Sequence, residues 1–122
     1  FPTAEAHVGL GTVLASRGQW MDAIGQCAAA IRIDPEFGDA YNDTGVYLLE
    51  LGDLDAALDW LDKAIAAPRG NCRHYPHYHR AQILERQAKF VEARDALLKS
   101  LKIAPEWEPA QAALHRVLSW LN

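Results

Sequence analysis

The residues best suited to chemistry gather in one short stretch in the second half of the chain. Cys72, His74, His77 and His79 place one thiol and three imidazole rings within eight residues, and both groups bind transition metals. The spacing is unfavourable for a metal site, however. Pro76 favours the first turn of a helix, and two histidines two residues apart on a helix point to different faces. We therefore expect helix-start packing here, and no metal or other cofactor.

The same stretch mixes aromatic and basic side chains, a combination that can stack on single-stranded nucleic acid. It reads RHYPHYHR from Arg73 to Arg80. The 122-residue chain as a whole is acidic, with 16 Asp and Glu against 12 Lys and Arg and a net charge of −4. Binding to the phosphate backbone needs a concentrated basic face. We therefore do not expect nucleic acid to be the partner.

The sequence carries no pattern typical of an enzyme or of a membrane span. Ser, His and Asp are present, but the nucleophile elbow, the P-loop, the dinucleotide fingerprint and the metal-hydrolase spacings are missing. No run approaches the roughly 18 apolar residues of a membrane helix. We expect neither catalysis nor a membrane span. Because the sequence starts at Phe1 rather than Met, we interpret it as a processed form or an excised segment, of undetermined compartment.

The elements that position these residues come from a stretch that occurs three times. The copies begin at Ala4, Gly38 and His74, with periods of 34 and then 36 residues. Small residues recur at fixed places, and two antiparallel helices can approach closely only where side chains are short. Each copy therefore predicts a helical hairpin. The matching places hold Gly11, Gly45 and Ala81; Gly18, Gly52 and Ala88; Ala23, Ala57 and Ala93; and the bulkier Leu14, Leu48 and Leu84.

This pattern resembles the tetratricopeptide repeat family, in which Ala-x3-Phe-x2-Ala and a closing Pro mark the second helix. The second helices here read Ala23-x3-Cys27-x2-Ala30, Ala57-x3-Leu61-x2-Ala64 and Ala93-x3-Leu97-x2-Ser100. Departures are mild, with Cys27 where Phe is usual, Ser100 where Ala is usual and Arg80 where Leu is usual in the first helix. The resemblance implies an all-α, right-handed superhelix (solenoid) of three helix-turn-helix repeats and a C-terminal capping helix.

On this basis we expect a single domain spanning residues 1–122. The repeats would occupy about 4–37, 38–73 and 74–107, and the capping helix about 107–121. Phe1 and Pro2 would lead into a first helix capped by Thr3. The two extra residues of the second period fall in the connector 69–74, which is longer than a tight turn needs.

The resemblance also implies a function: a protein-interaction module, as an adaptor or scaffold part of a larger protein or assembly. In the family, the first helices line a concave groove that accepts a peptide. We expect an apolar strip at its centre, Asn42 hydrogen-bonded to a peptide backbone, and Tyr78 important for binding but not for stability. The lining places carried over are Val8, Thr12, Asn42, Val46, Leu49, Tyr75, Tyr78, Gln82 and Arg86.

Two alternatives remain open. The segment could be a structural spacer that self-associates through the ends of its array, or an accessory region of a larger enzyme. One class of partner is disfavoured. A subclass of the family binds acidic chaperone C-terminal tails through Lys, Arg and Asn, but none of these residues occupies the corresponding places, and Asp43 would repel a carboxylate. Those places hold Val8, Thr12, Asp43, Tyr75 and His79.

Overall fold

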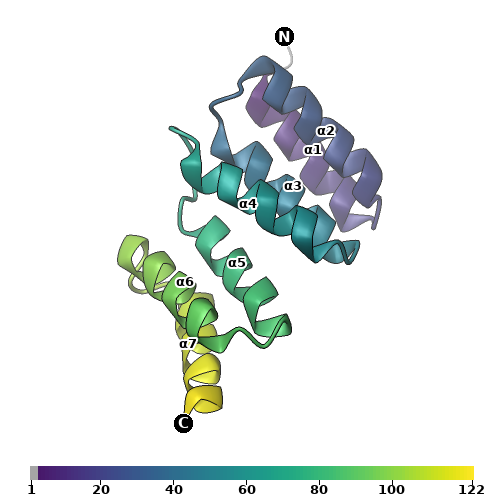
Figure 1. Ribbon diagram of the computed structural model, residues 1–122. Helices are drawn as coiled ribbons and strands as arrows, with labels where there is room; N and C mark the ends of the chain where they lie inside the picture. The colour runs from purple at the N-terminus through teal and green to yellow at the C-terminus, as the bar shows by residue number, and fades with distance from the viewer. Residues whose placement is uncertain (1–2) are drawn as a thin grey trace. The chain divides into compact units, whose positions relative to one another are not determined.

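The computed structural model describes residues 3–122 and contains seven helices (Figure 1). They are α1 (Ala4–Ser16), α2 (Trp20–Ile33), α3 (Gly38–Glu50), α4 (Leu54–Ala66), α5 (Tyr75–Arg86), α6 (Phe90–Ile103) and α7 (Glu108–Leu121). The predicted all-α class is confirmed. Phe1 and Pro2, expected to lead into α1, lie outside the described residues. Over residues 3–122 the helices are too short or too polar to cross a bilayer.

The chain divides into two compact units, and each is described by itself. Residues 1–71 hold α1 to α4, and residues 72–122 hold α5 to α7. The boundary falls in the connector 69–74, where the sequence predicted extra length. That the whole chain behaves as one domain of three repeats stays a prediction.

The turn inside each hairpin has the same geometry. Gly18, Gly52 and Ala88 adopt positive φ values of 74°, 86° and 58°. The amide after each of them donates back to an aligned leucine carbonyl, as in Lys89 N to Leu84 O at 2.8 Å. This is the Schellman ending of a helix, and it normally requires glycine at the left-handed position. The sequence alignment of these three residues therefore reflects one backbone conformation.

The helix starts differ more from one another than these turns do. The Thr3 side chain accepts a hydrogen bond from Ala6 N at 3.0 Å, which confirms Thr3 as the cap of α1. Asp53 caps α4 in the same way, accepting from Ala56 N at 3.2 Å. The other helices begin without a side-chain cap bond, so packing between helices must hold these starts in place.

In the unit of residues 1–71, α1 pairs with α2, α3 pairs with α4, and α2 packs on α3 (Figure 1). The closest approach lies at Gly45 on α3. A Cβ built there would lie 2.8 Å from Leu61 Cγ and 3.2 Å from the Ala57 carbonyl oxygen. Leu61 is fully buried. The small residue that the repeat pattern places at Gly45 is therefore required by the packing of α3 on α4.

The two ends of the α3–α4 hairpin are tied together through their connectors. Gly38 N donates to Arg69 O at 2.6 Å, and the Arg69 guanidinium donates to Asp34 Oδ1 at 2.6 Å. Asn71 N donates to the Asp39 carboxylate at 2.9 Å. These contacts fix the chain where it leaves α4.

In the unit of residues 72–122, α5 pairs with α6 and α7 packs on α6. Ser100, which replaces the usual alanine, is buried and its hydroxyl donates to His74 O at 3.0 Å. That bond gives the substitution a role, because it anchors the residue before α5 onto α6. The buried core of this unit consists of Ala81, Leu84, Ala93, Ala96, Leu97, Ala110, Ala113 and Val117.

Replacing Gly45 by Ala should destabilise the protein, because the new methyl group would collide with Leu61 in a filled core. Overpacking of this kind costs about 1–3 kcal/mol. Gly11→Ala is the matched control: its Cβ would come no closer than 3.3 Å, to Ala23 O. Thermal melting of both variants checks the expectation. Equal melting temperatures for the two would contradict the assigned helix contact.

Ala88→Gly should stabilise the protein. Ala88 is exposed, so little packing is lost, and the left-handed conformation costs an alanine on the order of 1 kcal/mol. After the larger entropy of an unfolded glycine is subtracted, we expect a gain of about 0.5–1 kcal/mol in chemical denaturation. Gly52→Ala, at the equivalent turn, should lose stability. A loss for Ala88→Gly would be incompatible with the positive φ at this residue.

Candidate binding surfaces

The first helices of residues 1–71 place the predicted groove residues in different environments. Thr12 is exposed, and its hydroxyl donates to Val8 O at 3.2 Å. Val8 and Val46 are half-buried. Asn42 and Leu49 are only 5% and 6% exposed. Leu49 therefore does not present the open apolar surface that we expected of the central strip.

Asn42 and Asp43 form a polar pair on α3. Asn42 Nδ2 donates to Asp43 Oδ1 at 3.2 Å, while the buried Asn42 Oδ1 accepts no hydrogen bond from any described residue. Burial raises the pKa of Asp43, the hydrogen bond from Asn42 opposes this and the negative charge of Asp39 adds to it, and the result is a pKa of about 6. Burial likewise raises the pKa values of nearby Cys27 and Tyr47 to about 12. The environment of Asp43 therefore supplies no cation.

In residues 72–122, Tyr75 and Tyr78 belong to an aromatic cluster around Trp107. The Trp107 ring centre lies 5.1 Å from that of Tyr75 and 4.8 Å from that of Tyr78. His74 completes the cluster, 4.6 Å from Trp107. Tyr78 also packs against the core of this unit. These contacts contradict the expectation that Tyr78 is unimportant for stability, because its ring joins α5 to the start of α7. Its importance for binding stays a prediction.

A polar network extends along α5 from this cluster. His79 Nδ1 lies 2.9 Å from Gln82 Oε1, and Gln82 Nε2 donates to the Tyr78 hydroxyl at 3.3 Å. One turn further, Glu85 accepts two hydrogen bonds from Arg116 of α7, at 2.8 and 2.7 Å. These bonds hold the pKa of Glu85 below its usual range. Gln82 is thus engaged within α5, whereas Arg86 is exposed.

These contacts engage the histidines of the stretch from Cys72 to His79 with different partners. His74 makes an edge-to-face contact with Trp107, and His79 is held by Gln82. Burial lowers the pKa values of His77 and His79, which disfavours the charged ring. Over residues 3–122, three or more His, Cys, Asp or Glu side chains nowhere come together as a metal site.

Comparison with known proteins agrees with this architecture. The family model described as "Tetratricopeptide repeat" matches residues 8–71. The chain belongs to the tetratricopeptide repeat family. Such repeats are protein-interaction modules, and the prediction from the sequence is confirmed to that extent.

Similar proteins are parts of longer chains or isolated domains. DnaJ homolog subfamily C member 3 of Mus musculus is 34% identical over 109 residues, which are 89% of this chain and 21% of that protein. Superkiller protein 3 of Schizosaccharomyces pombe is 27% identical over 98% of this chain and 7% of its own length. This chain therefore spans about a fifth or less of these relatives.

Among solved structures, the first tetratricopeptide domain of Spaghetti (RPAP3), bound to an HSP90 peptide, superposes with a TM-score of 0.86. The superposition covers 98% of this chain and 93% of that one, at 18% identity. At this identity the likeness shows the fold alone.

The tetratricopeptide hairpins also form a pocket that the sequence analysis missed. Its volume is about 520 Å³, and all its residues belong to the unit of residues 1–71. Tyr41 and Trp60 stack in its wall with ring centres 6.0 Å apart. Neither Tyr41 nor Trp60 is among the residues that the sequence analysis expected to line a binding site. The lining residues are Ile31, Pro35, Tyr41, Trp60, Lys63, Ala66, Ala67 and Pro68.

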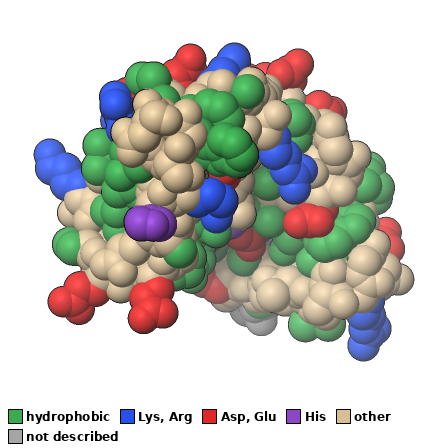
Figure 2. Space-filling model, turned by 90° about the horizontal axis from the view of Figure 1, so that it is seen from below, with side chains coloured by type: hydrophobic (Ala, Val, Ile, Leu, Met, Phe, Trp, Pro, Cys, Tyr) green, Lys and Arg blue, Asp and Glu red, His purple; other side chains and the backbone are tan. Residues whose placement is uncertain are grey.

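Other apolar side chains are exposed on the surface between polar and charged ones (Figure 2). Met21 and Trp120 are the most open of the large ones, at 67% and 62% exposed. Trp120 stacks on Phe90, with ring centres 5.7 Å apart, so it also has a packing role. Scattered exposed apolar residues are ordinary on soluble domains and do not by themselves mark a binding surface.

Asp43→Asn should stabilise the protein at pH 7.5 but not at pH 4. The folded-state pKa of about 6 exceeds the ordinary 3.8, so the folded state retains a proton that the unfolded state has lost. Stability therefore falls as pH rises from about 4 to about 6, and an uncharged side chain avoids this loss, on the order of 3 kcal/mol. Melting temperatures across pH, with exposed Glu50→Gln as control, provide the measurement. A stabilisation by Asp43→Asn that is the same at both pH values would contradict the burial of a carboxylate.

Proposed function

We propose that the first-helix faces of each unit bind a peptide segment. The observation that carries the proposal is the unpaired carbonyl oxygen of Asn42. Buried polar atoms almost always have a hydrogen-bond partner, and a peptide backbone N–H would supply the one that Asn42 lacks once its side chain, 5% exposed in the free protein, rotates toward the ligand. Exposed Thr12, in the same unit, offers a further polar contact.

In residues 72–122 the corresponding face offers Gln82 and Arg86 on α5. Gln82 is half-buried with its amide oriented by His79 and Tyr78, and Arg86 is exposed. A side chain held by its neighbours loses less conformational entropy on binding. Tyr75 and Tyr78 supply aromatic surface, but their contacts with Trp107 make them part of the fold as well.

The peptide would not be an acidic chaperone tail. The places that a carboxylate clamp would use hold Val8, Thr12, Asp43, Tyr75 and His79. Asp43 is mostly ionised at neutral pH, since its pKa of about 6 lies below 7, and would repel a carboxylate. His79 is kept neutral by burial, which lowers its pKa.

Calorimetry with the peptide SRMEEVD should therefore show no measurable binding at pH 7. The first tetratricopeptide domain of RPAP3, whose structure contains an HSP90 peptide of this sequence, is the positive control. Tight binding to the present chain would show that the ligand places have been assigned in the wrong register.

The proposal is one of binding and includes no catalytic role. A scaffold role within a longer protein fits the relatives, which exceed this chain several-fold in length.

A set of variants tests the binding face. Peptides selected from a displayed library on the wild-type domain should lose affinity when the face they use is blocked, by Thr12→Trp in residues 1–71 or by Arg86→Trp in residues 72–122. Lys102→Trp, at an exposed position of α6, is the matched control and should bind normally. Asn42→Leu should weaken binding to residues 1–71, and its melting temperature is measured alongside, because the substitution removes the unpaired oxygen together with the amide that donates to Asp43. Affinity that is equal in all four variants would place the binding surface elsewhere.

A further inference from the structure

We propose that the pocket around Trp60 is a second peptide site, and that it takes a basic segment with one bulky apolar side chain as its anchor. This site is distinct from the first-helix faces of α1, α3 and α5, because its walls come from the ends of α2 and α4 and the first turn of α3.

Size and composition suit an apolar anchor. A volume of about 520 Å³ lies within the usual range of ligand pockets, roughly 300–1,000 Å³. Two aromatic rings, two prolines and three small or aliphatic residues form the walls, and Lys63 is the one charged residue among them. Nothing in the lining calls for a polar ligand group at the bottom of the pocket.

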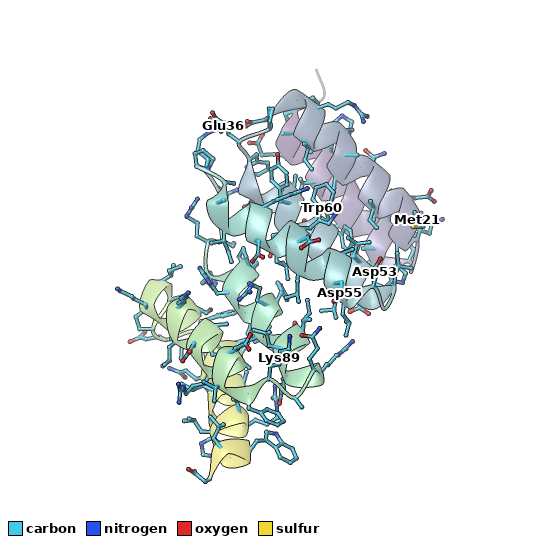
Figure 3. All side chains as sticks on the ribbon, in the orientation of Figure 1. Met21, Glu36, Asp53, Asp55, Trp60 and Lys89 are labelled. Carbon is cyan, nitrogen blue, oxygen red and sulfur yellow. The ribbon has the colours of Figure 1, made fainter. Side chains whose placement is uncertain are left out.

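The pocket is held open by contacts within the unit. The Tyr41 hydroxyl donates to Pro35 O at 2.7 Å, and the Tyr41 ring stacks on Trp60. Figure 3 labels Trp60 on α4. Two prolines further limit backbone freedom at the rim. A site formed in advance in this way binds with a smaller loss of conformational entropy.

The charge around the pocket favours a cationic ligand. The last turns of α2 and α4 form part of its wall, and the carbonyl end of a helix carries partial negative charge. Asp59 and Asp62 neighbour Trp60 in the sequence of α4 and are exposed. They point to other faces of the helix than Trp60, so they act on a ligand through the electrostatic field of the unit and not by lining the pocket. Residues 1–71 contain eleven Asp and Glu against four Lys and Arg, a net charge of −7, whereas residues 72–122 carry +3. A basic segment would therefore be attracted to this unit.

The effect of Lys63 on binding distinguishes a basic ligand from an acidic one. Its ammonium lies 4.1 Å from the centre of the Trp60 ring, which shows that the ring face accepts a cation. An acidic ligand would need Lys63 as its partner, so Lys63→Ala would weaken its binding. A basic ligand would be repelled by Lys63, and the same substitution would strengthen binding.

Fluorescence anisotropy with three labelled peptides tests the site on the intact domain. GSKRLPFKRS carries basic flanks and an apolar anchor, GSEDLPFEDS has acidic flanks, and GSKRGSGKRS lacks the anchor. We expect the first to bind about tenfold or more tighter than either of the others, and to weaken as salt is added. Tighter binding of the acidic peptide, or equal binding without the anchor, would overturn the proposal.

Variants then locate the binding. Trp60→Ala should weaken binding of the basic peptide by about tenfold or more, and Ala66→Trp should do the same by filling the pocket without truncating its wall. Ala112→Trp, at an exposed alanine of α7, is the matched control. Lys63→Ala should tighten binding several-fold, and Asp59→Asn/Asp62→Asn should weaken it, with Glu92→Gln/Glu106→Gln as control.

The results also separate this site from the first-helix faces. If Arg86→Trp and Thr12→Trp abolish binding of GSKRLPFKRS while Ala66→Trp does not, the pocket proposal fails and the first-helix proposal stands. Loss with Ala66→Trp alone supports the pocket, whatever the outcome for the first-helix faces.

Discussion

The close contact of paired helices at small residues is the constraint on which the rest of each unit depends. At Gly45 the backbone of α3 comes so near α4 that an added Cβ would lie 2.8 Å from Leu61 Cγ. Because one side of each first helix is committed to this contact, only its other sides remain for a ligand or for the next hairpin. The same contact brings Tyr41 of α3 beside Trp60 of α4, so the pocket also depends on it.

Features set by local backbone geometry could be predicted from the sequence. The recurrence of Gly18, Gly52 and Ala88 located the three left-handed turns, and Thr3 was identified as a cap from its side chain and position. Features set by packing between residues distant in the sequence could not be predicted. Trp107 contacts residues some thirty positions earlier, and the repeat pattern carries no signal for this beyond its equivalence to buried Phe37.

The groove residues show the same limit of sequence-based prediction, in their burial. A repeat position states which way a side chain leaves its helix, and Leu49 and Asn42 were assigned to an open face on that ground. Both are nevertheless buried, because exposure depends on everything that packs nearby and not on direction alone. The repeat register therefore predicts which residues share a face more securely than it predicts which of them are accessible to a partner.

Two carboxylates on equivalent first helices show how the units differ electrostatically. Glu85 receives both arms of the Arg116 guanidinium, which holds its pKa low. Asp43 receives one neutral amide donor, and burial raises its pKa to about 6. The Glu85 carboxylate is thus paired with a cation within its own unit, whereas residues 1–71 keep an uncompensated carboxylate next to an unpaired Asn42 oxygen. Both groups are acceptors, so a ligand that offsets their desolvation must bring donors or positive charge. The two proposed sites in this unit therefore call for the same ligand chemistry.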